Sequence, residues 1–141
     1  AALSTGLPVW IGFSAMLAND GKNLLGWRWK NSLPPVEFSK LVEEISPMGG
    51  EAAGVMHSQV RDTGPALDIL SRIWSGPKLA YAETGKLEKP DWSFKEIYSP
   101  KNYTEEIKTW IKKFGVNIIG GCCGTGPEHI RMLKNQIIDT A

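Results

Sequence analysis

Residues 116–130 have the sequence VNIIGGCCGTGPEHI, and this stretch decides the fold that we expect. Its apolar run at 116–119 is typical of a strand, and two glycines and two adjacent cysteines follow it. A helix is predicted to begin at Pro127, because proline is favoured at the first helical position. The thiols of Cys122 and Cys123 should therefore lie at the C-terminal end of a strand. In parallel α/β folds, reactions take place at this edge of the sheet.

The two cysteines of this 141-residue chain are these neighbours, and three interpretations fit such a pair. They could form a strained vicinal disulfide, they could be two small apolar core residues, or they could both bind one metal ion. Flanking glycines would let the backbone turn tightly around an ion. The spacing alone leaves all three open, because a lone Cys-Cys pair is not a recognised zinc spacing.

The longer string resembles the signature of a known family. GGCCGT at 120–125, followed by PEHI at 127–130, closely resembles the signature of the homocysteine S-methyltransferases, a family of zinc-dependent methyl-transfer domains. That family includes betaine-homocysteine methyltransferase, S-methylmethionine-dependent enzymes and cobalamin-dependent methionine synthase. The resemblance spans nearly the whole chain and implies that Cys122 and Cys123 are both zinc ligands.

The rest of the chain indicates alternating strands and helices. Apolar runs predict strands at 8–14, 52–57, 79–82 and 116–119. Apolar residues at helical spacing predict helices over 38–48, 66–74, 107–114 and 127–137. Long loops are expected at 15–35 and 83–102. Such strict alternation predicts an α/β fold whose parallel sheet has right-handed crossovers.

Four strand–helix units make up half of a (β/α)8 barrel, whose full length is about 250 residues. The resemblance agrees, because it implies that residues 1–141 form a single segment, the C-terminal half of the catalytic TIM-type barrel. A half-barrel leaves two strand edges and part of an apolar interior uncovered. We therefore predict that the chain is a fragment that pairs with an N-terminal half-barrel chain, or that it self-associates.

A histidine takes the place of the family's third zinc ligand. Catalytic zinc sites usually have three protein ligands and an open fourth position. In the family the third thiolate ends a Gly-Val/Ile-Asn-Cys sequence, and the matching residues 54–57 are GVMH. Histidine binds zinc well, so the resemblance implies a metal site of His57, Cys122 and Cys123. The alternative is that His57 is a hydrogen-bonded barrel residue and that zinc has been lost.

Glu83 and Gly121 are the predicted substrate-binding residues. The family tends to have Pro-Asn-Ser-Gly after the tyrosine of the third strand, whereas AETG follows Tyr81 here. Glu83 would lie at the mouth of the barrel, where its carboxylate could bind an amino group or support a histidine ligand. The alternative is a solvated loop residue. Gly121 belongs to the signature loop itself.

Several other residues have structural and functional interpretations. Thr125 and Glu128 fit a capping box at the start of the last helix, and His129 is expected to be structural. Trp27 and Trp29 follow the first strand, where they could hold a cationic methyl donor by cation–π attraction or simply pack their loop onto the barrel.

The composition excludes several classes of partner. Sixteen basic residues against 15 acidic ones give a net charge of +1, which provides no argument for binding nucleic acid or an anionic membrane. No apolar run approaches the roughly 20 residues of a membrane span, and residues 1–6, AALSTG, lack the features of a signal peptide. Adjacent cysteines cannot join distant parts of a fold, so we expect a reducing, cytoplasmic location.

The resemblance also implies a reaction. Zinc would bind the sulfur of homocysteine, and the thiolate would take a methyl group from a small sulfonium, ammonium or folate donor, giving methionine. The missing N-terminal half would be needed. A second hypothesis is a non-catalytic or degenerate half-barrel subunit that keeps the Cys-Cys loop for a zinc-supported structure. A third, a redox-active dithiol, lacks the flanking positive charge that lowers a thiol pKa.

Overall fold

The structure is a computed structural model that describes residues 2–27, 34–88 and 93–138. Within these residues, parallel strands form one sheet in the order β1-β4-β5-β8: β1 (Trp10–Phe13), β4 (Ala52–Gln59), β5 (Lys78–Glu83) and β8 (Ile118–Ile119). The helices that follow these strands are α1 (Phe38–Ile45), α2 (Val60–Ile73), α3 (Pro100–Phe114) and α4 (Pro127–Leu133). The predicted α/β alternation with a parallel sheet is confirmed, as expected for part of a (β/α)8 barrel.

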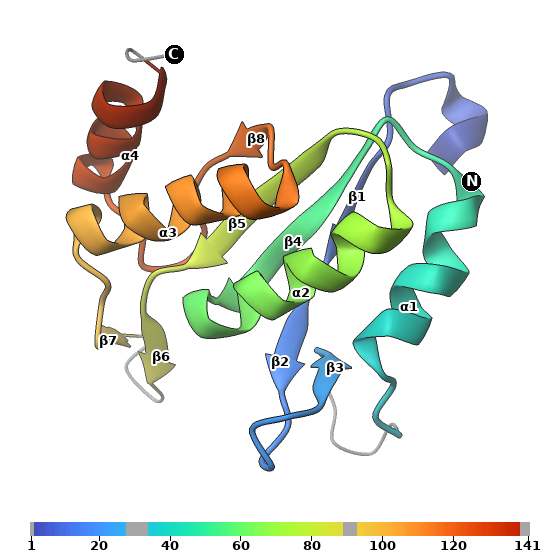
Figure 1. Ribbon diagram of the computed structural model, residues 1–141, viewed down its shortest axis with the longest axis horizontal. Helices are drawn as coiled ribbons and strands as arrows, with labels where there is room; N and C mark the ends of the chain where they lie inside the picture. Colours follow the sequence, from blue (N-terminus) through green and yellow to red (C-terminus); the bar gives the residue numbers. More distant parts are fainter. Residues whose placement is uncertain (1, 28–33, 89–92, 139–141) are drawn as a thin grey trace.

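Three of the helices, α1, α2 and α3, lie side by side on one face of this sheet (Figure 1). Apolar side chains from both layers form the core, among them Phe13, Phe38, Val55, Leu67, Leu70, Ala80, Ile107 and Trp110. The opposite face of the sheet is less covered, as the alternating side chains of β1 show. Phe13 is buried against the helices, whereas Trp10, which points to the opposite side, is 54% exposed.

The close pairing of β4 with β5 depends on a glycine. Gly54 lies in the middle of β4, in register with Leu79 of β5. A Cβ atom at Gly54 would overlap the carbonyl oxygen and side chain of Leu79. Glycine therefore lets the two central strands approach each other at this point.

The two long loops predicted at 15–35 and 83–102 each contain a β-hairpin. In the first, β2 (Ala15–Leu17) pairs antiparallel with β3 (Leu24–Gly26), and in the second, β6 (Lys86–Glu88) pairs with β7 (Ser93–Lys95). Asp20 fixes the first turn, because its carboxylate accepts the N–H groups of Lys22 and Asn23 at 2.9 and 3.0 Å. Strands of three residues are too short to show a period of two, which is why the sequence did not reveal them.

The start of α2 also differs from the expectation. α2 begins at Val60, ahead of the apolar run from Ala66, and it accommodates Pro65 in its second turn. Asp62 in the first turn favours this earlier start, since a carboxylate there interacts well with the helix dipole. Short 3-10 turns, η1 (Ala2–Thr5) and η2 (Ser46–Met48), lie before β1 and after α1.

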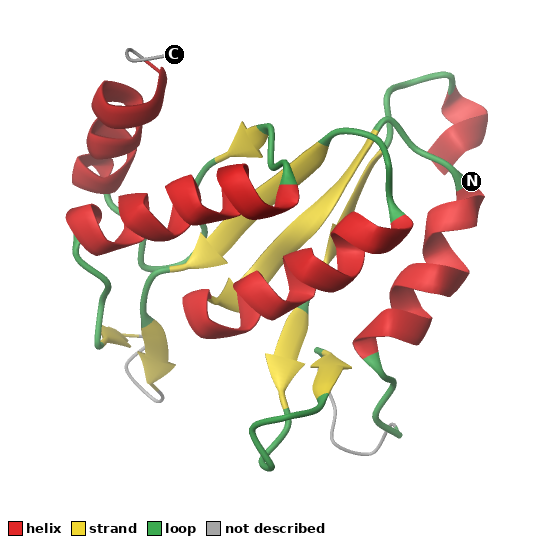
Figure 2. Cartoon of the chain, viewed as in Figure 1, coloured by secondary structure: helices red, strands yellow, loops and turns green. Residues whose placement is uncertain are grey.

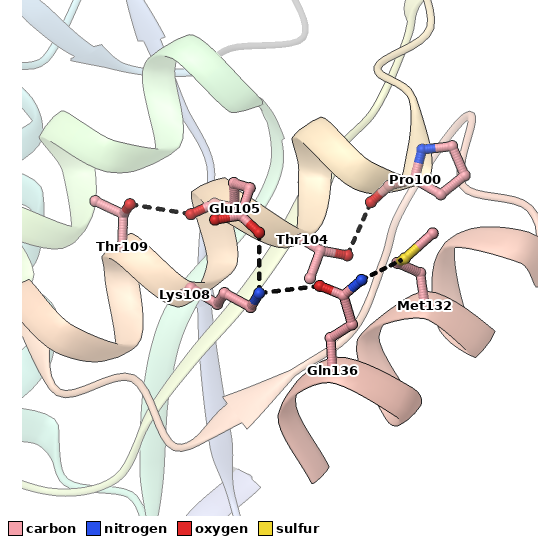
Figure 3. A network of polar contacts seen from close by, with 7 residues as sticks. All are labelled: Pro100, Thr104, Glu105, Lys108, Thr109, Met132 and Gln136. Atoms are coloured by element: carbon pink, nitrogen blue, oxygen red, sulfur yellow. Dashed lines mark hydrogen bonds and ion pairs between the residues drawn. The ribbon is translucent and has the colours of Figure 1, made fainter. Parts of the chain in front are cut away.

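Polar contacts join α3 to the end of the chain (Figure 3). Lys108 Nζ donates to Glu105 on its own helix and to Gln136 Oε1, both at 2.9 Å. Gln136 belongs to a π-helical turn, η3 (Lys134–Ile138), that continues α4, and its amide also donates to the sulfur of Met132. These contacts hold the last helical segment against α3. In the part of the chain that is described, no helix has the length and apolar character needed to span a membrane.

Candidate metal centre

Four side chains meet at the C-terminal ends of three neighbouring strands. His57 comes from β4, Glu83 is the last residue of β5, and Cys122 and Cys123 follow β8. One ligand atom from each residue lies within 4.8 Å of those of the other three. His57 is exposed and the others are half-buried. The three predicted metal ligands are thus brought together, with Glu83 among them.

A β-bulge aims His57 at the thiols. The register between β4 and β5 shifts between Met56 and Gln59, and His57 has a φ of 49°, in the left-handed region that few residues other than glycine adopt. Ser58 holds this bulge, because its hydroxyl donates to the carbonyl of Met56 at 3.0 Å and accepts the N–H of Ala15 at 2.8 Å. As a result His57 Nδ1 lies 3.2 Å from Cys122 Sγ.

Backbone hydrogen bonds fasten the cysteine loop to the end of β5. The N–H of Cys122 donates to Ala82 O at 3.2 Å, and Cys123 O accepts the N–H of Thr84 at 3.0 Å. Gly124 turns the loop back with a φ of +79°, and a Cβ atom there would lie 2.9 Å from Gly85 N. Glycine is required at this position for both reasons.

Hydrogen bonds made by two buried side chains, Tyr103 and His129, hold the cysteine loop and the start of α4 in place. Tyr103 on α3 donates its hydroxyl to Gly120 O at 2.8 Å. His129 is 2% exposed, and its Nε2 lies 2.7 Å from Tyr98 O, an atom that can only accept. Its Nδ1 accepts the N–H of Gly126 at 3.1 Å, which leaves Nε2 to carry the proton that is donated to Tyr98 O. These contacts agree with the structural role expected for His129.

The capping box predicted from Thr125 and Glu128 is wrong. The N-cap of α4 is Gly126, and the reciprocal bond to its N–H comes from the side chain of His129. The hydroxyl of Thr125 instead contacts that of Thr84 at 3.5 Å. The tertiary contact with the end of β5 therefore replaces the local cap that the sequence favoured.

Burial and negative neighbours shape the electrostatics of the cluster. Burial, and then the neighbouring Cys122 and Glu83, raise the pKa of Cys123 to about 11. Burial also raises the pKa of Glu83, opposed by a positive charge on His57 and by a hydrogen bond from Cys123. Both cysteines are free thiols, so the disulfide alternative does not describe this structure. A bound cation would reverse these shifts, because it favours the ionised thiol.

The distances and the donor types fit zinc. The sulfur atoms of Cys122 and Cys123 are 3.8 Å apart, and two thiolates at about 2.3 Å from a tetrahedral zinc ion would also be about 3.8 Å apart. Two sulfurs, an imidazole nitrogen and a carboxylate oxygen are all accepted zinc ligands. Glu83 was expected to bind substrate or support a ligand, but its carboxylate lies among the donor atoms themselves.

A cavity of about 610 Å³ adjoins the cluster and shares His57 and Glu83 with it. Its other lining residues are Ser14, Ala15, Met16, Leu17, Trp27, Ser58, Gln59, Arg61, Asp62 and Lys86. Trp27 lines this cavity, where it could contact a cationic methyl donor as one of the two interpretations of the tryptophans holds. Trp29 falls outside the described residues. Gly121 is not among the lining residues, and a Cβ atom at this position would overlap the side chain of Thr125. Sequence reasoning missed Arg61 and Asp62, whose one signal is their position directly after β4.

Comparisons with known proteins point in one direction. Over residues 1–137 the chain matches the family described as homocysteine S-methyltransferase. It is 25% identical over 123 residues to Homocysteine S-methyltransferase YbgG of Bacillus subtilis, a match that covers 86% of this chain and 36% of that protein. Homocysteine S-methyltransferase 3 of Zea mays is 24% identical over 134 residues, which cover 93% of this chain and 36% of the maize protein.

A shorter match is closer in sequence. Homocysteine S-methyltransferase 1 of Saccharomyces cerevisiae is 34% identical over 64 residues, covering 43% of this chain and 19% of the yeast protein. The chain thus spans little more than a third of the length of the bacterial and maize relatives. Because the family match extends over nearly all of its residues, the chain belongs to the homocysteine S-methyltransferase family.

Proposed function

We propose that residues 1–141 are the C-terminal half of a zinc-dependent enzyme that methylates the thiol of homocysteine to give methionine. The observation that carries this proposal is the convergence of His57, Cys122 and Cys123 at the ends of adjacent strands, with their donor atoms within 4.8 Å of one another. Family membership supports the reaction class. Free cysteines also suit a reducing compartment such as the cytoplasm.

The reaction needs no protein nucleophile. A thiol has an ordinary pKa of about 8.5, and bound zinc would lower it so that the sulfur is ionised at neutral pH. The S–H proton leaves to solvent, and a sulfur lone pair forms the new S–CH3 bond. The bond between the methyl group and the donor breaks, and its electron pair stays on the donor sulfur or nitrogen. The remaining task of the protein is to align the two substrates.

The residues of this chain have distinct roles in the proposal. His57, Cys122 and Cys123 hold the metal, and two thiolates with a neutral imidazole balance the charge of Zn²⁺. A three-thiolate site would carry one negative charge, so this set should make the substrate thiol easier to ionise but less nucleophilic. Glu83 is shared by the cavity and the donor cluster, which consists of the four side chains His57, Glu83, Cys122 and Cys123 that could hold a metal ion. It hydrogen-bonds Cys123 and also lines the cavity wall. Substrate binding by Gly121 stays a prediction.

An N-terminal half-barrel is the proposed partner. β1 and β8 are the edge strands of the sheet, and Trp10 is exposed on the face opposite the helices. Edge strands and exposed apolar groups favour pairing with another chain or segment. A second half of four strands would pair with the two edge strands and cover Trp10. It would also close the cavity beside the metal centre.

The first prediction concerns zinc content. The chain, purified without chelator or affinity metal, should hold about one zinc ion, as expected for one mononuclear site. His57→Ala should lose most of the metal because the site then lacks one of its three proposed protein ligands. Gln59→Ala, which removes a side chain from the same strand end, should keep it. Elemental analysis of the three proteins makes the comparison.

A methyl-transfer assay separates the two functional hypotheses. The zinc-loaded chain, mixed with the N-terminal half-barrel of a full-length relative, should convert homocysteine to methionine with a sulfonium or ammonium donor. Zinc binding without transfer would favour the degenerate half-barrel subunit. Equal zinc in the His57→Ala variant and the unchanged chain would rule out histidine as a ligand.

A further inference from the structure

The cavity beside the metal centre contains a buried carboxylate that the proposed chemistry does not use. Asp62 lies in the first turn of α2 and is 4% exposed, yet it lines the cavity. Glu83 lines the same cavity, and the negative charge of Asp62 contributes to the raised pKa of Glu83. Asp62 therefore lies near the donor cluster, within reach of a small ligand held there.

The carboxylate of Asp62 is only partly satisfied by the protein. It accepts a hydrogen bond from the backbone N–H of Leu17 on β2, but Oδ1 has no hydrogen-bond partner among the described residues. Arg61 Nε approaches Oδ1 to 3.5 Å, and the rest of this arginine is largely exposed. A buried carboxylate oxygen without a donor is unfavourable, since its lost hydration is not replaced.

We propose that Asp62 binds the α-ammonium group of an amino-acid ligand and that Arg61 binds the carboxylate of the same ligand. An ammonium group has three N–H donors, and a hydrogen-bond donor is what Oδ1 lacks, while its charge complements that of the carboxylate. The guanidinium of Arg61 presents a planar pair of donors suited to a carboxylate. Neighbouring opposite charges thus match the zwitterionic head of an amino acid.

This inference rests on the proposed function, and it identifies the residues that bind the end of the substrate away from the sulfur. Homocysteine would reach from the donor cluster to Asp62 through its side-chain carbons. A methyl donor such as S-methylmethionine carries the same head group. The shared chemistry is therefore the α-amino acid head, and the experiment must tell which of the two ligands supplies it.

Asp62 also has a structural role, because its bond to Leu17 joins α2 to the β2–β3 hairpin. Asp62→Asn suits a test, since asparagine keeps the shape and can still accept the N–H of Leu17. Asp68→Asn is a matched control: it removes a carboxylate from the same helix, but Asp68 is paired with Arg72 and does not line this cavity. Equal zinc content and equal thermal stability of the variants will show that both are folded.

The test compares homocysteine with 4-mercaptobutyrate, which lacks only the amino group. Isothermal titration of the zinc-loaded proteins, each in complex with the N-terminal half-barrel of a full-length relative, should show that Asp62→Asn binds homocysteine about 10- to 100-fold more weakly, the range expected for a hydrogen bond to a charged group. Its affinity for 4-mercaptobutyrate should not change, and Asp68→Asn should bind both thiols normally. S-methylmethionine is titrated in the same way.

Each outcome has one meaning. A loss confined to homocysteine assigns Asp62 to the thiol substrate, and a loss confined to S-methylmethionine assigns it to the donor. Two outcomes would overturn the role of Asp62 while leaving the proposed reaction intact. One is unchanged affinity of Asp62→Asn for homocysteine and for S-methylmethionine, and the other is an equal loss of affinity for homocysteine and for 4-mercaptobutyrate. If the unmodified zinc-loaded chain binds none of these ligands even in complex with the N-terminal half-barrel, the proposed function itself fails, and this inference with it.

Discussion

Tyr103 shows how a single buried residue supports the cysteine loop from a distant part of the sequence. Its side chain is fully buried, and its hydroxyl donates to Gly120 O at 2.8 Å and lies 3.4 Å from Ala82 O. The hydroxyl therefore connects α3 with the two strand ends that position the thiols. Burial is the main reason that the pKa of Tyr103 is raised above its usual value.

Tyr103→Phe should lower the free energy of unfolding by about 1–3 kcal/mol at neutral pH, because the partly buried Gly120 carbonyl loses its donor. The pH dependence should change as well. In the unfolded chain Tyr103 ionises near pH 10, whereas in the folded chain its raised pKa keeps it protonated. Above about pH 10 the unfolded state binds fewer protons, so this contribution to stability falls as pH rises.

Urea denaturation of both proteins between pH 8 and about 11 tests this contribution. The slope of stability against pH above 10 should be smaller in Tyr103→Phe than in the unmodified chain. Identical slopes would mean that Tyr103 titrates normally in the folded protein.

At the level of elements, the local sequence sets the limits of α3. Ser99 is its N-cap and accepts the N–H of Asn102 at 3.2 Å, and Pro100 follows at the first helical position. Gly115 ends the helix with a φ of +67°, in the left-handed region. Lysines 112 and 113 in the last turn suit the helix dipole. The helix thereby presents Tyr103 to the cysteine loop.

Ser99→Ala should destabilise the protein by about 1 kcal/mol, because the Asn102 N–H at the start of α3 loses its acceptor. Ser71→Ala is the matched control, since Ser71 lies inside α2, where alanine has the higher helix propensity. Its stability should be unchanged or slightly higher. Denaturant titration of both variants measures the difference, and equal losses in the two would show that the Ser99 cap contributes nothing specific.

Over the whole molecule, the helix layer covers one face of the sheet, and α1, α2 and α3 lie over its strands (Figures 1 and 2). The opposite face includes the exposed Trp10, and both edge strands are available for pairing. In a closed barrel the corresponding face points to the interior and neighbouring strands continue the sheet. The proposal of a partner half rests on this asymmetry.

The chain should form a 1:1 complex with the N-terminal half-barrel of a full-length relative, and it should self-associate as its concentration rises when that half is absent. Trp10→Glu, which places a charge on the uncovered face, should weaken both associations. Ile73→Glu, a change at an exposed position at the end of α2, should not. Size-exclusion chromatography with light scattering gives the masses. A chain that stays monomeric throughout and binds no partner half contradicts the prediction.

The sequence by itself determined the order of the elements and the location of the thiols. Apolar periodicity is a local property, so the strands at 52–57, 79–82 and 116–119 could be recognised without knowing their neighbours. The position of Cys122 and Cys123 after a strand followed from the same local pattern. The GGCCGT string likewise implied the family that the comparisons then showed.

Only the tertiary structure decided how the site is assembled. The strand order places β5 between β4 and β8, and this adjacency, together with the bulge at His57, brings Glu83 among the donor atoms. The same folding buries Asp62 in the cavity wall and replaces the predicted cap at Thr125 with a contact to Thr84. The physical reason is that these contacts join residues far apart in the chain, and neither composition nor periodicity encodes which strand ends will be neighbours.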